Sequence, residues 1–312
     1  MDDRLTVRAA YLYYRDALTQ AQVAERLGIS RVKVGRLIAS ALARGIVTID
    51  IQHPLSRATE MEVALENRFG LRDAVVATSP AVGGEDELRL LAVAAAGADY
   101  LRSLDLSGTQ VAVGWGTTMQ AVSNALAENW ASDIDVYQLN GAVPVSGYAT
   151  RAGEIMNRFG QRSHGRAHLL QVPAIVDRSE VRDALESDRS VQQALEGARS
   201  APVAMFSLGG LRADSVLVSS GYVSAPDIES LRAKGAVGDV ISRFIDADGH
   251  VADTALDDRT MGIELERLGT RERAIGIAAG SAKAAVARAA ITGGHVNTLV
   301  VDDLLAAALL EG

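Results

Sequence analysis

The sequence contains no cysteine among its 312 residues. This excludes thiol nucleophiles, disulfide scaffolds, cysteine-ligated zinc sites and iron–sulfur clusters, because each needs a sulfur atom that the chain lacks. Long apolar runs are also missing. No uncharged stretch approaches the ~18 residues needed to cross a bilayer, and the first 20 residues are charged and tyrosine-rich, unlike a signal peptide. We therefore expect a cytoplasmic protein with no membrane partner.

Metal-binding motifs are scarce as well. The five histidines have neither HxxxH nor HExxH spacing, so no metal site is expected, and we expect no cofactor. The run Asp246-Ala247-Asp248-Gly249 imitates the start of a calcium loop. The residues from His250 onward lack the remaining oxygen ligands, so we predict a β-turn there.

Charge is unevenly distributed along the chain. The net charge is -8, but residues 1–50 hold eight basic and five acidic residues, a net of +3, which leaves -11 for the remainder. A basic segment joined to an acidic body is expected when one part meets a polyanion and the other holds a small-molecule site. Surface helices often carry extra arginines, so this interpretation needs a motif to support it.

A helix-turn-helix motif occupies the basic segment. Thr19 and Gln22 have capping-box spacing at the start of a helix predicted over residues 19–27. Gly28 suits the left-handed conformation that ends a helix, and Ser30 is a good N-cap for the next one. The alternative is an ordinary helical hairpin whose exposed face is basic.

The second helix of the motif has the pattern of a recognition helix. We predict that it buries Val34, Leu37, Ile38 and Leu42. Its other side presents Arg31, Lys33 and Arg36 near the end that enters the major groove, where arginine can bind guanine. Thr19, Gln20 and Ser30 complete the predicted DNA contacts, because the capped helix starts can donate backbone N–H groups to phosphates.

The rest of the N-terminal domain is predicted more coarsely. Residues 46–51 alternate as a half-buried strand would, and they suit one strand of a wing, although no second wing strand is visible. A helix over residues 4–17 would support the winged domain, which we place at residues 1–53. Residues 54–70 follow as a linker helix with Met61, Leu65 and Phe69 on one side.

The sequence pattern of residues 71–312 predicts a large α/β domain, which forms the body of the protein. Short apolar runs alternate there with helical patterns, which argues for a doubly wound, mostly parallel sheet. The predicted strands are 73–78, 110–114, 134–139, 169–176, 203–208, 274–278 and 298–301. The fold class is therefore α/β, with a small winged helix-turn-helix domain followed by a large Rossmann-like domain.

Ligands of such sheets lie at the carboxyl ends of the strands, so the residues after each apolar run carry information. In the run Gly114-Trp115-Gly116-Thr117-Thr118 a strand turns through glycines into a helix that opens with two hydroxyls. Glycines let the backbone approach an anion, and helix N–H groups with threonines can bind phosphate oxygens. An ordinary strand-to-helix turn is the alternative.

Three further places follow predicted strands or glycine turns. Gly209 lies in a glycine pair after a strand, where a tight turn fits equally well. Asp239 is a glycine-flanked carboxylate that can accept hydrogen bonds from sugar hydroxyls or cap a helix. Lys283, one of only three lysines, opens a helix after a glycine turn and is either a phosphate contact or a solvent-facing side chain.

Together these motifs resemble the SorC family of bacterial sugar-responsive transcriptional regulators, over nearly the whole chain. The matching stretches, in chain order, are LTQAQVAERLGISRVKVGRLIASALARGIVTIDI, ENRFGL, VAVGWGTTM, QLNGAV, SGYVS, LRAKGAVGDV, FIDADGHV and AAGSAKAAVARAAITGGHVNTLVVDD. The resemblance implies a winged helix-turn-helix joined to an effector domain similar in fold to sugar-phosphate isomerases and glucosamine-phosphate deaminases, without their catalysis.

The resemblance also implies that residues 71–312 form the sugar-phosphate effector-binding and oligomerisation domain, and it implies roles for single residues there. A phosphorylated sugar or polyol would bind there. It would change the affinity of a homo-oligomer, a dimer or tetramer, for a long, roughly palindromic operator in double-stranded DNA. Gly116, Thr117 and Thr118 would hold the phosphate with Lys283 nearby. Asn140 and Gly141 would border the sugar, and Asp239 would accept its hydroxyls.

Some positions depart from the family pattern. The chain has Gly141-Ala142 where the family often has two glycines, and Val301-Asp302 where a threonine often precedes the aspartate. Ala278 and Ala279 also shorten the glycine run before Gly280. These departures bear on which effector binds rather than on its class.

Two other functions compete with a sugar-phosphate-switched regulator. One is a sugar-phosphate isomerase or deaminase with an accessory helix-turn-helix. Such chemistry needs a general base of tuned pKa, and Asp239 is the one carboxylate that the sequence places near a substrate. The other is DNA binding without any ligand, which fits the phosphate-like loops poorly.

Overall fold

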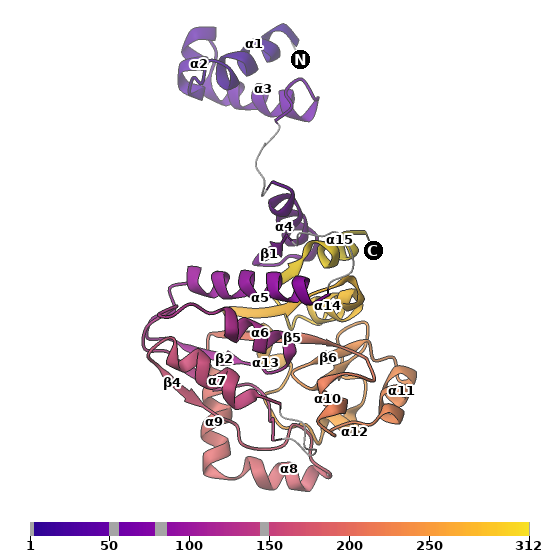
Figure 1. Cartoon of the computed structure of the whole chain (residues 1–312). Helices are drawn as coiled ribbons and strands as arrows, with labels where there is room; N and C mark the ends of the chain where they lie inside the picture. Colours follow the sequence, from indigo (N-terminus) through magenta and orange to yellow (C-terminus); the bar gives the residue numbers. More distant parts are fainter. Residues whose placement is uncertain (1–2, 50–55, 79–85, 144–149, 312) are drawn as a thin grey trace. The chain divides into compact units, whose positions relative to one another are not determined.

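The computed structural model describes residues 3–49, 56–78, 86–143 and 150–311. The chain divides into two compact units, Met1–Ser56 and Arg57–Gly312. Figure 1 shows the helices of the first unit gathered together, and a sheet flanked by helices in the second. Among the described helices, none is both long and apolar enough to span a bilayer.

The N-terminal unit contains α1 (Asp3–Tyr14), α2 (Gln20–Leu27) and α3 (Arg31–Ala43). The predicted capping box at α2 is confirmed. The Gln22 amide donates to Thr19 Oγ1 at 3.4 Å, and the Thr19 amide donates to Gln22 Oε1 at 2.9 Å. Gly28 ends α2 with φ +63°, and Ser30 caps α3 through the Lys33 amide at 3.2 Å. The local signals therefore placed both helices of the motif correctly.

One predicted core residue of α3 is wrong. Leu42 is 41% exposed, and Ala41 is buried in its place. The buried residues of α3 are spaced by three, one and three positions, which is the period of a single helix face. They are Val34, Leu37, Ile38 and Ala41. Leu42 lies about 100° further round the helix, beyond the edge of that face.

The predicted wing strand is also wrong over the residues that the structure describes. Residues 46–49 form no strand, and residues 50–51 lie outside the described part. The amides of Ile46 and Val47 both donate to the Ala41 carbonyl, at 2.9 and 3.2 Å, and so close the C-terminus of α3 instead. No strand partner is present within residues 3–49, and an unpaired strand has nothing to stabilise it.

The second unit alternates strands with helices. Its strands are β1 (Asp73–Ala77), β2 (Gln110–Val113), β3 (Asp135–Gln138), β4 (Arg166–His168), β5 (Val203–Gly210), β6 (Gly238–Val240), β7 (Arg243–Ile245), β8 (Arg273–Ala278) and β9 (Thr298–Asp302). Its longer helices are α4 (Ser56–Phe69), α5 (Asp86–Ser103), α6 (Thr117–Ala125), α7 (Ala152–Gln161), α8 (Ser179–Glu186), α9 (Arg189–Ser200), α11 (Ala225–Ala233), α14 (Ala284–Thr292) and α15 (Asp303–Glu311). Short helical turns are α10 (Val216–Ser219), α12 (Thr254–Asp257), α13 (Glu266–Gly269) and the 3-10 turn η1 (Ser281–Lys283).

The main sheet has the order β1-β9-β8-β5-β2-β3-β4, and every pair along this path is parallel. The end of β5 also pairs antiparallel with β6, which forms a hairpin with β7. From β2 the chain adds β3 and β4 on one side, then returns to place β5 on the other. The strand order therefore reverses between β2 and β5, where open α/β sheets bind their ligands.

Helices cover both faces of this sheet. Successive residues of β5 alternate between two hydrophobic clusters, with Ala204, Phe206 and Leu208 in one and Val203 and Met205 in the other. The first cluster contains side chains of α4, α9, α14 and α15, and the second contains those of α5, α6 and α7. Strands buried on both faces explain why they appear in the sequence as continuous apolar runs.

One predicted strand is misplaced. Residues 169–176 form no strand and make only an isolated bridge between Ile175 and Thr260. The strand beside β3 is β4, three residues earlier. The Val172 carbonyl accepts the amides of Ala142 and Val143 at 2.8 and 3.1 Å, so this apolar segment is used to pack loops rather than to extend the sheet.

The helix expected as a linker, α4, packs within the second unit. Leu65 is fully buried in the first hydrophobic cluster, with Met61 and Phe69 packed against it, as their spacing predicts. The adjacent strand β1 is an edge strand. The Glu62 carboxylate accepts the Val76 amide at 2.9 Å, and the Glu66 carboxylate accepts the Ala74 amide at 3.1 Å. These carboxylates satisfy edge amides that have no strand partner in the described sheet.

Candidate functional site

A cavity of about 830 Å³ lies at the carboxyl ends of β2, β5 and β8, beside the point where the strand order reverses. Its walls come from the loops that follow these strands, from the start of α6 and from the β6–β7 hairpin. Eight of the nine predicted effector-binding residues line it, namely Gly114, Gly116, Thr117, Thr118, Asn140, Gly209, Asp239 and Lys283. Loops far apart in the sequence thus meet at one polar pocket.

The loop after β2 presents the start of α6 to this pocket. Gly114 packs so tightly against β5 that an added Cβ would lie 3.1 Å from Phe206 Cβ. Gly116, the N-cap residue before α6, has φ +128° and no side chain, so α6 has no side-chain cap for its first amides among the described residues. Thr117 and Thr118 add two hydroxyls at the same place, which suits an anion.

Asp239 and Lys283 bring opposite charges to the pocket. Asp239 pairs with Gly209 across the β5–β6 ladder, and an added Cβ at Gly209 would lie 1.8 Å from Asp239 Oδ1. At Gly210 it would lie 3.3 Å from Lys283 Nζ. The glycine pair at the end of β5 therefore leaves room for both side chains, which an ordinary tight turn does not require.

Burial perturbs both charged groups. It raises the pKa of the Asp239 carboxyl to about 6, against the opposing effects of the Lys283 ammonium and the Ser242 amide, which donates to Asp239 Oδ2 at 3.1 Å. Burial also lowers the pKa of Lys283, and the Asp239 charge opposes that shift. Two desolvated, oppositely charged groups in one cavity are typical of a functional site.

The loop after β8 is bonded to the end of the neighbouring strand β9. Gly280 has φ +87°, and its amide donates to Asp302 Oδ1 at 2.9 Å. Asp302 ends β9, is fully buried, and lies 3.5 Å from the Arg89 guanidinium, which also lines the pocket. In the pair Val301-Asp302 it is Val301 that departs from the family pattern, while the aspartate is kept and positions the loop that carries Lys283.

A buried amide closes the pocket near the β6–β7 hairpin. Asn140 Nδ2 donates to Ser242 Oγ at 2.8 Å, while Asn140 Oδ1 is buried without a partner among the described residues. Ile241 and Ser242 form the turn of the hairpin, and both have positive φ, +49° and +70°. A β-branched residue in this conformation is strained, and such strain collects at functional sites. Asn140 and Asp239 hold the turn through Ser242.

The structure does not bring Gly141 to the pocket. Its carbonyl accepts Trp115 Nε1 at 2.9 Å, and an added Cβ would lie 2.2 Å from the Pro173 carbonyl oxygen. This glycine permits close packing behind the site. Sequence reasoning missed Arg89 and Ser242, which do line the cavity. Arg89 lies inside an apolar helical pattern and Ile241-Ser242 is no common turn pair, so neither gives a local signal.

The raised pKa of Asp239 leads to a stability prediction. The folded protein binds this proton more tightly than the unfolded chain, so the wild type loses stability as pH rises from about 4 to about 6. Asp239→Asn lacks this loss. We expect the variant to match the wild type near pH 4 and to exceed it by about 2 kcal/mol at pH 7.5, because Asp239 is half-buried and solvent screens part of the effect.

Urea unfolding of both proteins at a series of pH values measures this difference. Asp214→Asn is a suitable control, because Asp214 is exposed, its pKa is lowered by Arg212, and it should show no gain at pH 7.5. An Asp239→Asn variant that is less stable than the wild type at pH 7.5 would contradict the assigned protonation behaviour.

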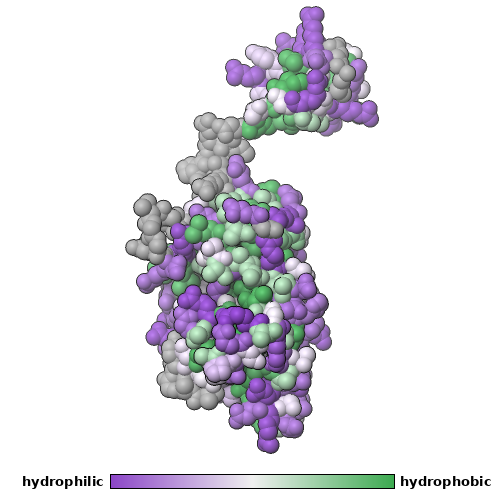
Figure 2. All heavy atoms as spheres, turned by 90° about the vertical axis from the view of Figure 1, so that its right-hand side faces the viewer, coloured by the Kyte–Doolittle hydropathy of each residue, from purple (hydrophilic) through white to green (hydrophobic). Residues whose placement is uncertain are grey.

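The second candidate surface is the outer face of the helix-turn-helix. Arg31, Lys33 and Arg36 are all exposed, and within the described residues none forms an ion pair with a carboxylate. Thr19 is exposed at the start of α2, Gln20 follows it half-buried, and Ser30 caps α3. Figure 2 shows hydrophilic side chains projecting outward from this unit. The predicted DNA contacts therefore remain available to a polyanion.

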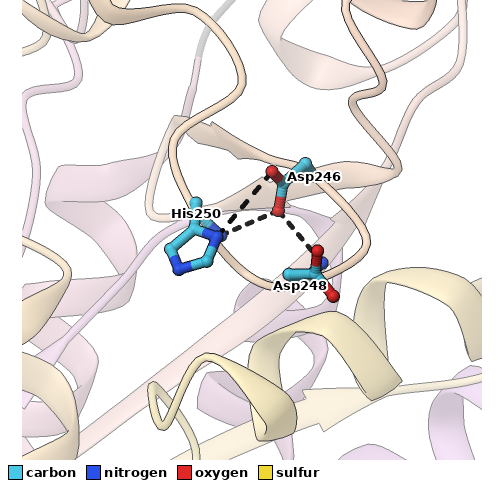
Figure 3. Close-up of side chains that lie close together, drawn as sticks. All are labelled: Asp246, Asp248 and His250. Carbon is cyan, nitrogen blue, oxygen red and sulfur yellow. Dashed lines mark hydrogen bonds and ion pairs between the residues drawn. The ribbon is translucent and has the colours of Figure 1, made fainter.

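The Asp246-Ala247-Asp248-Gly249 run forms the predicted turn (Figure 3). The Gly249 amide donates to the Asp246 carbonyl at 3.1 Å with φ +85°, while Asp246 Oδ1 accepts the amides of Asp248 and His250 at 3.0 and 2.9 Å. Side-chain oxygen or ring nitrogen atoms of three residues lie within 4.8 Å of one another, namely those of Asp246, Asp248 and His250. The three side chains are close together because the hydrogen bonds of the turn hold them there. They offer three ligands, whereas calcium takes six to eight.

The two units define a DNA-binding protein with a ligand pocket in its body. Residues 53–311 match the family model described as "Putative sugar-binding domain". The deoxyribonucleoside regulator of Bacillus subtilis is 33% identical over 99% of this chain and 97% of its own length. The erythritol catabolism regulatory protein EryD of Brucella abortus is 30% identical over the same shares.

A solved structure agrees over both units. The full-length sorbitol operon regulator SorC of Klebsiella pneumoniae has a TM-score of 0.75 and 30% identity, covering 99% of each chain. This chain belongs to the SorC family of transcriptional regulators. The three relatives are named as regulators, and none of these names describes an isomerase or deaminase.

Proposed function

We propose that the protein regulates a carbohydrate or polyol catabolic operon, and that a phosphorylated sugar or polyol modulates its binding to operator DNA. The observation that carries this proposal is the polar pocket at the β2–β5 reversal, in a chain that also has an unpaired basic recognition helix. Relatives named for deoxyribonucleoside, erythritol and sorbitol regulation support the effector class.

The pocket chemistry suits a ligand with two different ends. The uncapped start of α6, with Thr117 and Thr118, offers amides and hydroxyls to a phosphate, and Lys283 adds a positive charge. Asp239 and the unpartnered Asn140 Oδ1 offer acceptors to sugar hydroxyls. A charge-assisted contact at one end and hydroxyl recognition at the other would distinguish a sugar phosphate from a free sugar.

DNA recognition would need more than one copy of the chain. A single recognition helix contacts too little DNA to reach the ~10⁻⁸ M or tighter affinity of specific sites. We therefore propose a homo-oligomer, a dimer or tetramer, on a roughly palindromic operator of double-stranded DNA. Such a regulator acts where the chromosome is, in the cytoplasm.

We propose that the protein is not an enzyme. Asp239 has the raised pKa of a general base, but its Oδ2 accepts the Ser242 amide, and no histidine lines the pocket among the described residues. Incubation with a panel of sugar phosphates tests this directly. Thermal shift should identify a ligand, and NMR of the same mixtures should show it unchanged. Turnover of the stabilising compound would favour the isomerase or deaminase alternative.

We further propose that α4 transmits the effector signal. The loop that carries Lys283 is bonded to Asp302, which ends β9, and β9 pairs with β1. The edge amides of β1 are in turn accepted by Glu62 and Glu66 on α4. This series of contacts connects the pocket to the helix that begins where the N-terminal unit ends.

Removing both carboxylates of α4 tests the transmission. In the double variant Glu62→Ala/Glu66→Ala the two edge amides of β1 lose their acceptors on α4. A shift of β1 should therefore move α4 less. We expect DNA and effector binding to persist while the coupling between them falls by about 1 kcal/mol, within the 1–3 kcal/mol usual for such coupling.

Operator titrations with and without effector measure the coupling. Glu60→Ala is the matched control, because Glu60 is exposed on the same helix. Full coupling in the double variant would assign the transmission to another route.

A further inference from the structure

Val32 is an apolar side chain in an unusual place. It is 67% exposed, more than any other large hydrophobic residue in the described parts of the chain. It is the second residue of α3. Valine is a poorer helix former than alanine, so an exposed valine costs this helix stability and gives no packing in return. Packing within the N-terminal unit therefore does not explain why a valine occupies this position.

Its surroundings are basic. Arg31 and Lys33 flank it in the sequence, and Arg36 follows it by one helical turn. The helix RVKVGRLIASALA contains no acidic residue, and no described carboxylate pairs with these cations. A second copy of the same face would be repelled by like charge. Charge complementarity instead favours a polyanion that also offers an apolar group.

The helix period leaves Val32 accessible on the outer face. Val32, Gly35, Arg36 and Ala39 occupy successive positions of that face, opposite the buried stripe that packs on α1 and α2. Gly35 has no side chain and Ala39 only a methyl group, so neither covers the side chain of Val32. In a helix-turn-helix protein the N-terminal residues of this helix contact base edges in the major groove.

We propose that Val32 contacts the 5-methyl group of a thymine in the major groove of the operator, and so determines part of its sequence. The inference rests on the proposed function. Thymine is the one base that presents a methyl group there, and an aliphatic side chain has no donor or acceptor with which to read the other bases. Arg31 and Arg36 supply polar recognition beside this apolar contact.

Uracil substitution tests the contact at the level of single atoms, because uracil differs from thymine only by the missing methyl. Full-length protein first selects its preferred duplexes from a random-sequence pool, and each thymine of the selected site is then replaced by uracil. At one thymine position of each half-site we expect the wild type to lose about fourfold in affinity, as for one buried methyl group.

Val32→Ala completes the comparison. This variant should bind the thymine duplex about fourfold more weakly for each half-site, and it should show less than 1.5-fold difference between thymine and uracil at that position. Val7→Ala is the matched control, since Val7 is 50% exposed on α1 and undergoes the same substitution. It should keep the wild-type affinity and the wild-type sensitivity to uracil.

The outcomes separate the two proposals. Failure of the wild type to enrich any sequence would contradict the proposed DNA-binding function itself. Enrichment of a site in which every thymine can be replaced by uracil without loss would overturn the role of Val32 alone. So would an equal uracil penalty in the wild type and in Val32→Ala, because the methyl group would then be sensed elsewhere.

Discussion

Replacing Lys283 by methionine is expected to abolish the response to the phosphorylated effector while leaving operator binding intact. Methionine keeps most of the length of the side chain and removes its charge. Lys283 lines the same pocket as the start of α6, with its ammonium beside Gly210. A hydrogen bond between charged groups contributes about 1.5–3 kcal/mol, so effector affinity should fall roughly 10- to 150-fold.

Isothermal titration with the effector identified by thermal shift measures this loss, and operator titration checks that DNA binding persists. Lys234→Met is the matched control, because Lys234 forms an exposed ion pair with Asp253 and does not line the pocket. Loss of the Lys283 charge should also raise the pKa of Asp239 above about 6, since that charge lowers it. Effector affinity within twofold of the wild type in Lys283→Met would remove the phosphate contact from the account.

The second large effect is expected at the recognition helix. Arg31→Ala and Arg36→Ala should each weaken operator binding, because an arginine that binds guanine contributes about 1–3 kcal/mol of discrimination. Effector binding should be unchanged in both, since the two residues belong to the N-terminal unit. The affinity of the wild type should also fall steeply with salt, as it does for proteins that neutralise phosphates.

Arg102→Ala provides the control for charge. It removes one exposed arginine from α5 of the body and should leave the operator affinity unchanged. Gel-shift titration at fixed salt compares the three variants with the wild type. If both recognition-helix variants bind the operator as tightly as the wild type does, α3 is not the helix that reads DNA.

The sequence predicted best those features whose signals are local. Thr19, Gln22, Gly28 and Ser30 each act within a few residues of their own position, and all four take the predicted part in ending or capping a helix. The buried parallel strands were visible as apolar runs for the same reason. Because ligands collect at the carboxyl ends of such strands, the loops at Gly116, Asp239 and Lys283 could be singled out without knowing their contacts.

Features that depend on distant partners were missed. Arg89 reaches the pocket through a carboxylate 213 residues away, and Asn140 meets Ser242 across 102 residues. The apolar run at 169–176 satisfies a strand pattern, yet its carbonyls bond to loops instead of to a neighbouring strand. Leu42 fits an apolar pattern but lies beyond the edge of the buried face. Such outcomes are set by tertiary packing, which overrides local preference.

Whether a phosphorylated sugar controls DNA binding is decided by the operator affinity of the full-length protein, measured with and without the phosphorylated sugar that stabilises it. We expect that compound to change the affinity about 5- to 150-fold, the range of ordinary allosteric coupling, and its unphosphorylated counterpart to have no effect. Lys283→Met should bind the same operator and show no change. An operator affinity that is the same with every phosphorylated compound of the panel would contradict the account.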